Sequence, residues 1–248
     1  MGQNLTLEIC VDSLGLALAA VRGGADRIEL CGPLHDGGIT PSAGLAAAAR
    51  HSIDLPIAML VRSRTGAFTA TADEFEVMRQ DVLYARSIGM NLVVLGVLHE
   101  DRTVDIERTR ELVDCAGPME VTFHKAFDAA PDLKAALHDV KQTGATRILT
   151  SGGKSSAVLG APVVRDLLPE AGDQIELLLC GGISSATVRQ VIDRAGVREV
   201  HAALRNSIRV KPQTESISQE NLEHFSDCVS KLKEKMLQPD KSSKPIPV

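Results

Sequence analysis

Two short phrases near the start of the chain each place a cysteine two residues after a glutamate. The first is LEIC and the second is IELC, and aliphatic residues alternate with the polar ones in both. Alternate side chains of a β-strand point to opposite faces, so Glu8 and Cys10 share one face of a strand, and Glu29 and Cys31 share one face of another. Carboxylates can exchange protons or offset buried cations, and thiols can bind a soft metal such as Cu(I).

Other side chains suited to acid–base chemistry or anion binding lie at the ends of later apolar runs. They are Arg62, Arg64, His124, Asp128 and His201. Arginines bind carboxylates and phosphates through paired N–H groups, whereas imidazoles and carboxylates exchange protons. This combination favours a reaction on a small anionic substrate.

Two glycine-rich turns add candidate anion-binding positions. TSGGK contains Ser151, Gly152 and Lys154, and CGGIS contains Gly181 and Gly182. Where such a turn leads into a helix, the backbone N–H groups and the positive end of the helix attract an anion. Turns with two glycines also occur only to let a strand and a helix pack closely, and this alternative stays open.

The composition argues against several classes of partner. A formal charge of −5 and few aromatic residues disfavour nucleic acid, and the chain shows no signal peptide and no apolar run long enough to span a membrane. Five cysteines, an odd number in a chain too long to need disulfides, indicate reduced thiols and a cytoplasmic location. Nothing in the sequence implies a nucleotide cofactor.

Short β-rich runs alternate regularly with helical segments, and glycines separate many of them. The predicted strands are 5–11, 26–31, 56–62, 91–98, 119–125, 147–151, 175–181 and 198–203. The predicted helices are 13–22, 42–51, 72–88, 106–116, 132–143, 156–169, 185–195 and 219–236. Eight strand–helix units predict an α/β fold, a (β/α)₈ TIM barrel, as a single domain over residues 1–236. Residues 237–248 are rich in Pro, Lys and Ser and are predicted to form a disordered tail.

In such a barrel the charged residues of each strand face the axis, and active sites lie at the carboxyl ends of the strands. LEIC and IELC then become equivalent positions on neighbouring strands, and His124 and His201 also face inward. Lys125 is expected to point away from the axis. The alternatives are structural: the glutamates could neutralise buried arginines, the histidines could be satisfied core residues, and the cysteines could act as small apolar side chains.

Several phrases resemble the CutC family, a group named for copper homeostasis. They are GADRIELC, GGITPS, RSRTGAF, VTFHKAFD, TRILTSGGK and REVH, and they run from about Leu5 to His201 in the order of that family. The resemblance implies a (β/α)₈ barrel, a cytoplasmic location, homo-oligomers and Cu(I) binding. The matched positions that it implies for the site are Glu8, Cys31, Arg62, Arg64, His124, Asp128, Ser151, Gly152, Lys154 and His201. Ser63 stands where the family usually has proline, which leaves the placement of Arg64 open.

Two functional hypotheses follow, with copper or a small anionic metabolite as the partner. In the first, Cys10 and Cys31 bind Cu(I). In the second, the chain is an isomerase, epimerase or lyase for a small anionic or phosphorylated metabolite. Its substrate would be bound by Arg62, Arg64 and Lys154, while Glu8 and His124 exchange protons. A barrel that serves only as an oligomeric scaffold is a third alternative, which buried charges without a ligand disfavour.

Overall fold

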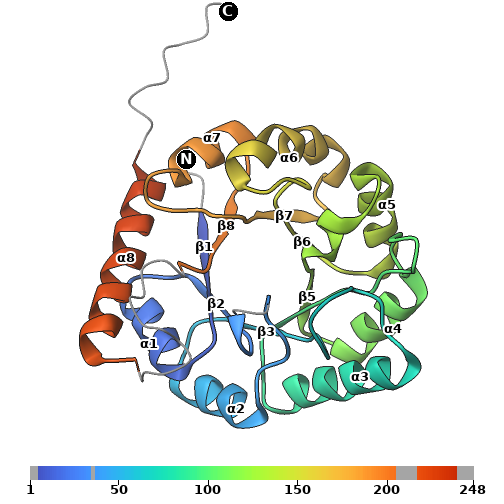
Figure 1. Ribbon diagram of the computed structural model, residues 1–248, viewed down its shortest axis with the longest axis horizontal. Coiled ribbons are helices and arrows are strands. Elements are labelled where there is room, and N and C mark those ends of the chain that lie inside the picture. The colour runs from blue at the N-terminus through green and yellow to red at the C-terminus, as the bar shows by residue number, and fades with distance from the viewer. Residues whose placement is uncertain (1–4, 35–36, 205–216, 239–248) are drawn as a thin grey trace, which may run out of the picture.

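The computed structural model describes residues 5–34, 37–204 and 217–238, and it contains a closed barrel of eight parallel strands in sequential order. A helix follows each strand and packs outside the barrel (Figure 1), so the predicted (β/α)₈ TIM barrel is confirmed. The strands are β1 (Thr6–Val11), β2 (Arg27–Leu30), β3 (Ile57–Leu60), β4 (Leu92–Leu95), β5 (Glu120–Phe123), β6 (Arg147–Thr150), β7 (Glu176–Leu179) and β8 (Glu199–Ala202). The helices are α1 (Leu14–Arg22), α2 (Ala43–Ser52), α3 (Ala72–Ser87), α4 (Ile106–Ala116), α5 (Leu133–Thr143), α6 (Ala157–Ala171), α7 (Val188–Ala195) and α8 (Gln219–Leu237).

All eight predicted strands are longer than the observed ones, and the difference lies mainly at their carboxyl ends. Residues 56–62 were expected to form one strand, but β3 ends at Leu60, and β5 ends at Phe123 before the short 3-10 helix η2 (Lys125–Ala129). Polar residues such as Arg62 therefore follow the strands and lie in the loops of the rim. Of the predicted tail, residues 237–248, Leu237 is the last residue of α8 and Gln238 follows it. The part of the tail after Gln238 lies outside the described residues. No helix in the described ranges has the length and apolar character needed to cross a membrane.

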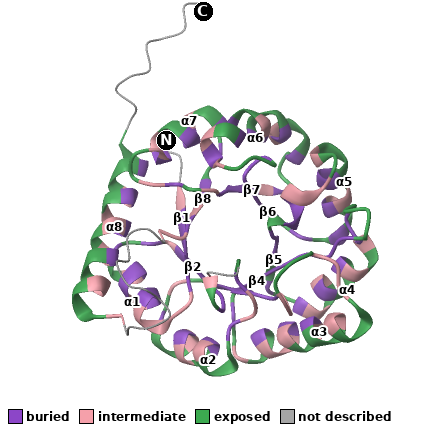
Figure 2. Ribbon diagram, viewed as in Figure 1, coloured by how far each residue is buried: buried purple, intermediate pink, exposed green. Residues whose placement is uncertain are grey.

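Outward-facing strand residues such as Ile9, Ile28 and Val200 are fully buried in the main core, between the strands and the helices. Figure 2 shows this layer as a ring of buried segments, with exposed residues on the outer helix faces. The barrel interior, in contrast to this layer, has an apolar part and a polar part. Its apolar part contains Ala58, Leu60, Leu92 and Val94 from β3 and β4, and Leu149, Leu178 and Cys180 from the β6 and β7 side.

Another part of the interior contains a network of arginine and glutamate side chains. Arg27 bonds Glu8 through Nε and lies 2.6 Å from Glu199 Oε2 through Nη2. Arg147 continues the chain, with its Nε 2.8 Å from Glu199 Oε2 and its Nη1 3.0 Å from Glu120 Oε2. Both arginines are nearly buried, so these carboxylates offset charges that would be costly alone. This network is the structural alternative considered for Glu8.

The register of β1 and β2 corrects the expected equivalence of LEIC and IELC. Glu8 pairs with Arg27, and Cys10 pairs with Glu29, so the second phrase is shifted by two residues relative to the first. This stagger is the shear that closes a barrel. Glu8 consequently lies at the level of the arginine network, while Glu29 lies at the level of Cys10, closer to the rim.

Candidate functional site

A cavity of about 450 Å³ lies at the carboxyl ends of the strands. Its lining comes from strand ends and the loops that follow: Cys10, Glu29, Leu34, Gly37, Leu60, Arg62, Phe68, His124, Lys125, Asp128, Ala129, Leu149, His201 and Ala203. This is the face on which TIM-barrel enzymes place their active sites.

Cys10 and Cys31 form a buried pair of thiols beside this cavity. Their Sγ atoms are 3.6 Å apart, and Cys31 Sγ also lies 3.4 Å from the carbonyl oxygen of Val11. Cys10 lines the cavity, whereas Cys31 is fully buried. The hydrogen bond with Cys31, burial and the charge of Glu29 raise the pKa of the Cys10 thiol. Cys10 therefore holds a proton that a metal ion would have to displace.

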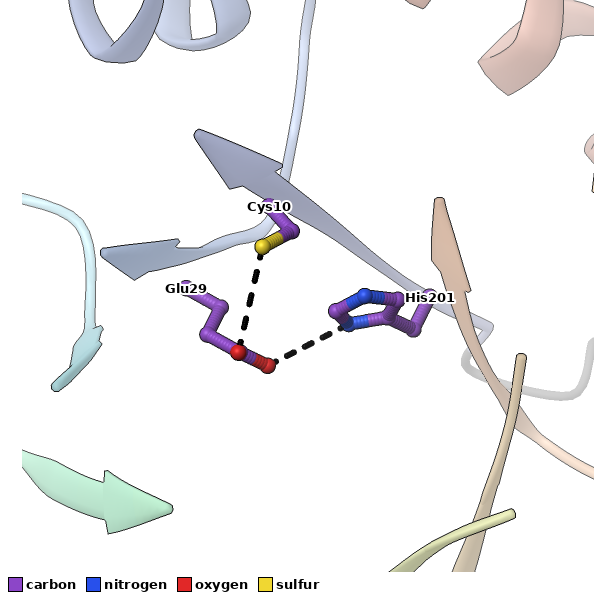
Figure 3. A group of neighbouring side chains, drawn as sticks. All are labelled: Cys10, Glu29 and His201. Carbon is purple, nitrogen blue, oxygen red and sulfur yellow. Dashed lines mark hydrogen bonds and ion pairs between the residues drawn. The ribbon is translucent and has the colours of Figure 1, made fainter. Parts of the chain in front are cut away.

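Glu29 lies between Cys10 and His201, as Figure 3 shows. Its Oε1 is 3.8 Å from Cys10 Sγ, and its Oε2 is 3.4 Å from His201 Nδ1. Among the described residues Oε2 has no hydrogen-bond partner, although it is buried. Burial raises the pKa of Glu29 to about 7, against the opposing charge of His201. The carboxylate is thus an unsatisfied acceptor at the cavity wall.

Cys10, Glu29 and His201 offer three ligand atoms that all lie within 4.8 Å of one another. One ring nitrogen of the imidazole is already engaged, however, because His201 Nδ1 is 2.7 Å from Glu8 Oε1. A metal ion on Nδ1 would have to displace Glu8. Burial opposes ionisation of Glu8, but Arg27 and His201 outweigh it and lower its pKa to about 2. Glu8 does not line the cavity and acts as the partner that holds His201.

Arg62 is held at the cavity wall by backbone groups and an aromatic ring. Its Nη1 donates to the carbonyl of Gly38 at 3.2 Å and its Nη2 to that of Gly66 at 2.7 Å. The guanidinium carbon lies 4.7 Å from the centre of the Phe68 ring, within cation–π range. His124 packs on the same ring, with the ring centres 5.0 Å apart.

His124 is a neutral histidine at this site. Burial, with the charge of Arg62, lowers its pKa to about 3, and its Nδ1 accepts a hydrogen bond from the Ala126 amide at 3.3 Å. An imidazole without a proton on Nδ1 can donate only through Nε2. His124 can therefore offer one donor to a ligand but carries no positive charge.

Arg64 was predicted beside Arg62 as an anion ligand, but it is not among the residues that line the cavity. It bonds Glu74 through Nε, and its other N–H groups donate to the carbonyls of Thr65, Ala67 and Thr69. The guanidinium is used within its own loop and at the start of α3.

The turn after β6 holds the predicted anion-binding residues Ser151, Gly152 and Lys154, and Asp128 occupies it. Asp128 accepts from the Ser151 amide at 2.9 Å and from the Gly153 amide at 2.9 Å, while the Gly152 amide bonds Thr150 Oγ1 at 2.8 Å. These N–H groups already have acceptors, and Lys154 is exposed outside the cavity.

The same turn also packs against α6. A Cβ on Gly152 would lie 2.6 Å from the carbonyl oxygen of Gly160. This close approach favours the alternative in which the glycines serve packing. Gly181 and Gly182 line a second cavity, of about 770 Å³, on the β7–β8 side, together with Lys125, His224 and Lys231.

Two charged lining residues, Glu29 and Lys125, were not among the predicted site residues. Lys125 was expected to point away from the axis, but this is wrong: it lines both cavities, and its Nζ lies 3.7 Å from Asp128 Oδ2. The strand alternation used for that expectation ends at Phe123, because η2 begins at Lys125. For Glu29, the IELC phrase gave the correct inward direction, but only the register shows that it is close to the rim.

Comparisons with known proteins agree with the resemblance noted above. A model of the CutC family matches residues 5–206. A family protein CutC of Xanthomonas campestris is 42% identical over 202 residues, which cover 82% of this chain and 84% of that protein. The human copper homeostasis protein cutC homolog is 39% identical over 201 residues, covering 81% of this chain and 74% of the relative.

A solved structure of a similar protein has the same fold. The crystal structure of a putative copper homeostasis protein CutC from Streptococcus agalactiae superposes with a TM-score of 0.76 at 27% identity. The superposition covers 79% of this chain and 97% of the other. The family model, the sequence relatives and the shared barrel lead to one conclusion: this chain belongs to the CutC family.

Proposed function

We propose that this protein acts in copper homeostasis by binding Cu(I) between Cys10 and Cys31. The observation that carries the proposal is the 3.6 Å separation of the two Sγ atoms at the wall of a cavity. Thiolates are ligands that Cu(I) prefers, and metal–sulfur bonds of about 2.3 Å, as for zinc, let two sulfurs at this separation share one ion. The names of the relatives, copper homeostasis proteins in human and mouse, support the choice of metal.

The surroundings of the thiol pair suit a soft, singly charged ion. Cys10 gives the ion access from the cavity, and the buried Cys31 excludes water from the other side. Glu29, next to Cys10, can balance the positive charge. His201 Nδ1 is not assigned as a ligand, because Glu8 already engages this nitrogen.

The test is a competition for Cu(I) against a chromogenic chelator under anaerobic conditions. The double variant Cys10→Ser, Cys31→Ser should bind Cu(I) at least about a hundredfold more weakly than the wild type, since both soft ligands are lost. Cys180→Ser is the matched control, because Cys180 is also a buried thiol of the barrel interior but lies apart from the pair. Equal affinities of the wild type and the double variant would refute the proposal.

The relatives' names support copper and give no support to the isomerase, epimerase or lyase alternative. We further propose that the protein works in the cytoplasm and forms a homo-oligomer, as the family resemblance implies. Fractionation of cells and analytical ultracentrifugation of the purified chain test these two expectations.

A further inference from the structure

We propose that the 450 Å³ cavity also binds a small organic oxyanion, a carboxylate or phosphate ester that carries a hydroxyl or amino group at its other end. This inference goes beyond copper binding and does not depend on it. The cavity has the volume of ordinary small-molecule sites, which are mostly apolar with a few fixed polar groups. Here those polar groups separate into a cationic part and an acceptor.

The cationic part consists of Arg62 and Lys125. Two of the five N–H groups of Arg62 bond backbone carbonyls, and Phe68 supports the guanidinium plane, so its position is fixed before any ligand arrives. Its Nε–H is buried and has no partner among the described residues. A Cβ at Gly37 would lie 3.5 Å from Nη1, so the glycine keeps space open beside the guanidinium.

Lys125 supplies the second positive charge. Its side chain is half exposed, and Nζ is 3.7 Å from an Asp128 carboxylate that already accepts shorter hydrogen bonds from four donor groups, which belong to Thr150, Ser151 and Gly153. The ammonium therefore retains donors for a ligand. An oxyanion between Arg62 and Lys125 would form charge-assisted hydrogen bonds with both, which are among the stronger ones in proteins.

The acceptor is Glu29. Glu29 lines the cavity, and its buried Oε2, which lies 3.4 Å from His201 Nδ1, makes no hydrogen bond among the residues described. A buried acceptor without a partner is unfavourable, and a ligand hydroxyl or ammonium group would satisfy it. The two parts together select molecules that carry an anion at one end and a donor at the other.

Isothermal titration calorimetry of the metal-free protein with two matched pairs of probes tests this preference. Glycerol 3-phosphate is compared with propyl phosphate, and glycerate with propionate; each pair shares its anion and its chain length and differs in hydroxyl groups. We expect the hydroxylated member of at least one pair to bind at least about tenfold more tightly. The pair that binds identifies the anion as phosphate or carboxylate. Absence of binding by all four probes at millimolar concentration would overturn the proposal.

Substitutions test which residues bind each end of the ligand. Arg62→Met and the more exposed Lys125→Met should each weaken binding at least about tenfold, and Glu29→Leu should abolish the advantage of the hydroxylated probe. Lys154→Met is the control, because Lys154 lies on the neighbouring turn outside the cavity. If Lys154→Met weakens binding as much as Lys125→Met, the anion is bound by the β6 turn and the assignment is wrong.

Discussion

His201 Nδ1 lies 2.7 Å from Glu8 Oε1, across the seam where β8 pairs with β1. The other oxygen of the same carboxylate binds Arg27 on β2. One fully buried side chain thus connects the first, second and last strands of the barrel.

Glu8→Gln should destabilise the protein by about 3 kcal/mol, because the variant removes a charge that offsets the buried Arg27. Because Gln keeps the size of the side chain, the decrease in unfolding free energy measures the contribution of the negative charge. Urea unfolding measures it. Glu76→Gln removes a carboxylate that binds Arg79 on the exposed face of α3, and no measurable change is expected there. A similar, negligible effect of both substitutions would contradict the role given to Glu8.

His124 should make stability fall as the pH falls below about 6.5. Its folded pKa of about 3 is below the ordinary value of 6.5, so the unfolded chain binds a proton that the folded chain does not. The contribution is fully present above pH 6.5 and decreases by about 2–3 kcal/mol down to about pH 4.5.

His124→Asn removes this titration and keeps an acceptor near Nδ1. The difference in unfolding free energy between wild type and variant should therefore shrink in acid, as measured by urea unfolding across this pH range. His138→Asn, on the exposed side of α5, should leave the pH dependence of the wild type unchanged. If His124→Asn also leaves it unchanged, His124 is not held neutral by its surroundings.

Gly160→Ala should destabilise the barrel, since its Cβ would lie 1.7 Å from the carbonyl oxygen of Ser151. The backbone of α6 or of the β6 turn would have to move, at a cost of at least about 2 kcal/mol. Gly44→Ala in α2 is the matched control, because its Cβ meets nothing within 4 Å. That substitution should stabilise the helix by about 0.5–1 kcal/mol. Thermal unfolding distinguishes the two, and equal melting temperatures would show that the turn and α6 can separate freely.

Asp128→Asn should loosen the turn after β6. An amide replaces one carboxylate oxygen with a donor, so it cannot accept from Thr150, Ser151 and Gly153 together, and we expect a loss of about 2 kcal/mol. Hydrogen exchange at the Ser151 and Gly153 amides should accelerate. Asp132→Asn, at the N-cap of α5, is the control, since Asn caps helices as well as Asp. Unchanged exchange in Asp128→Asn would mean that other contacts order the turn.

The number and order of the elements could be predicted from the sequence, because helices and strands have different periodicities and glycines mark many of the boundaries. The ends of the elements were less accurate. For α7, residues 185–195 were expected, but Ser184 and Thr187 form a turn and the helix begins at Val188. Short polar side chains that bond one another compete with the helix at its start.

For the site, strand alternation correctly placed Glu8, Cys10, Glu29 and Cys31 inside the barrel. It could not predict how far each side chain lies along the barrel axis, because the stagger between strands depends on closure of the whole sheet. For this reason the sequence favoured Glu8 as the reacting acid, whereas the structure places Glu29 at the cavity. Alternation also stops where a strand ends, so it failed for Lys125.

The ionic network of the barrel interior has a consequence for how the chain folds. Arg27 follows Glu8 by 19 residues and can meet it early, but Glu199 is separated from Arg27 by 172 residues and His201 from Glu8 by 193. Contacts between distant residues carry a large entropic cost and form slowly. A nascent chain that has not yet reached β8 leaves the edge of β1 unpaired, so completion of the barrel must await synthesis of its last strand.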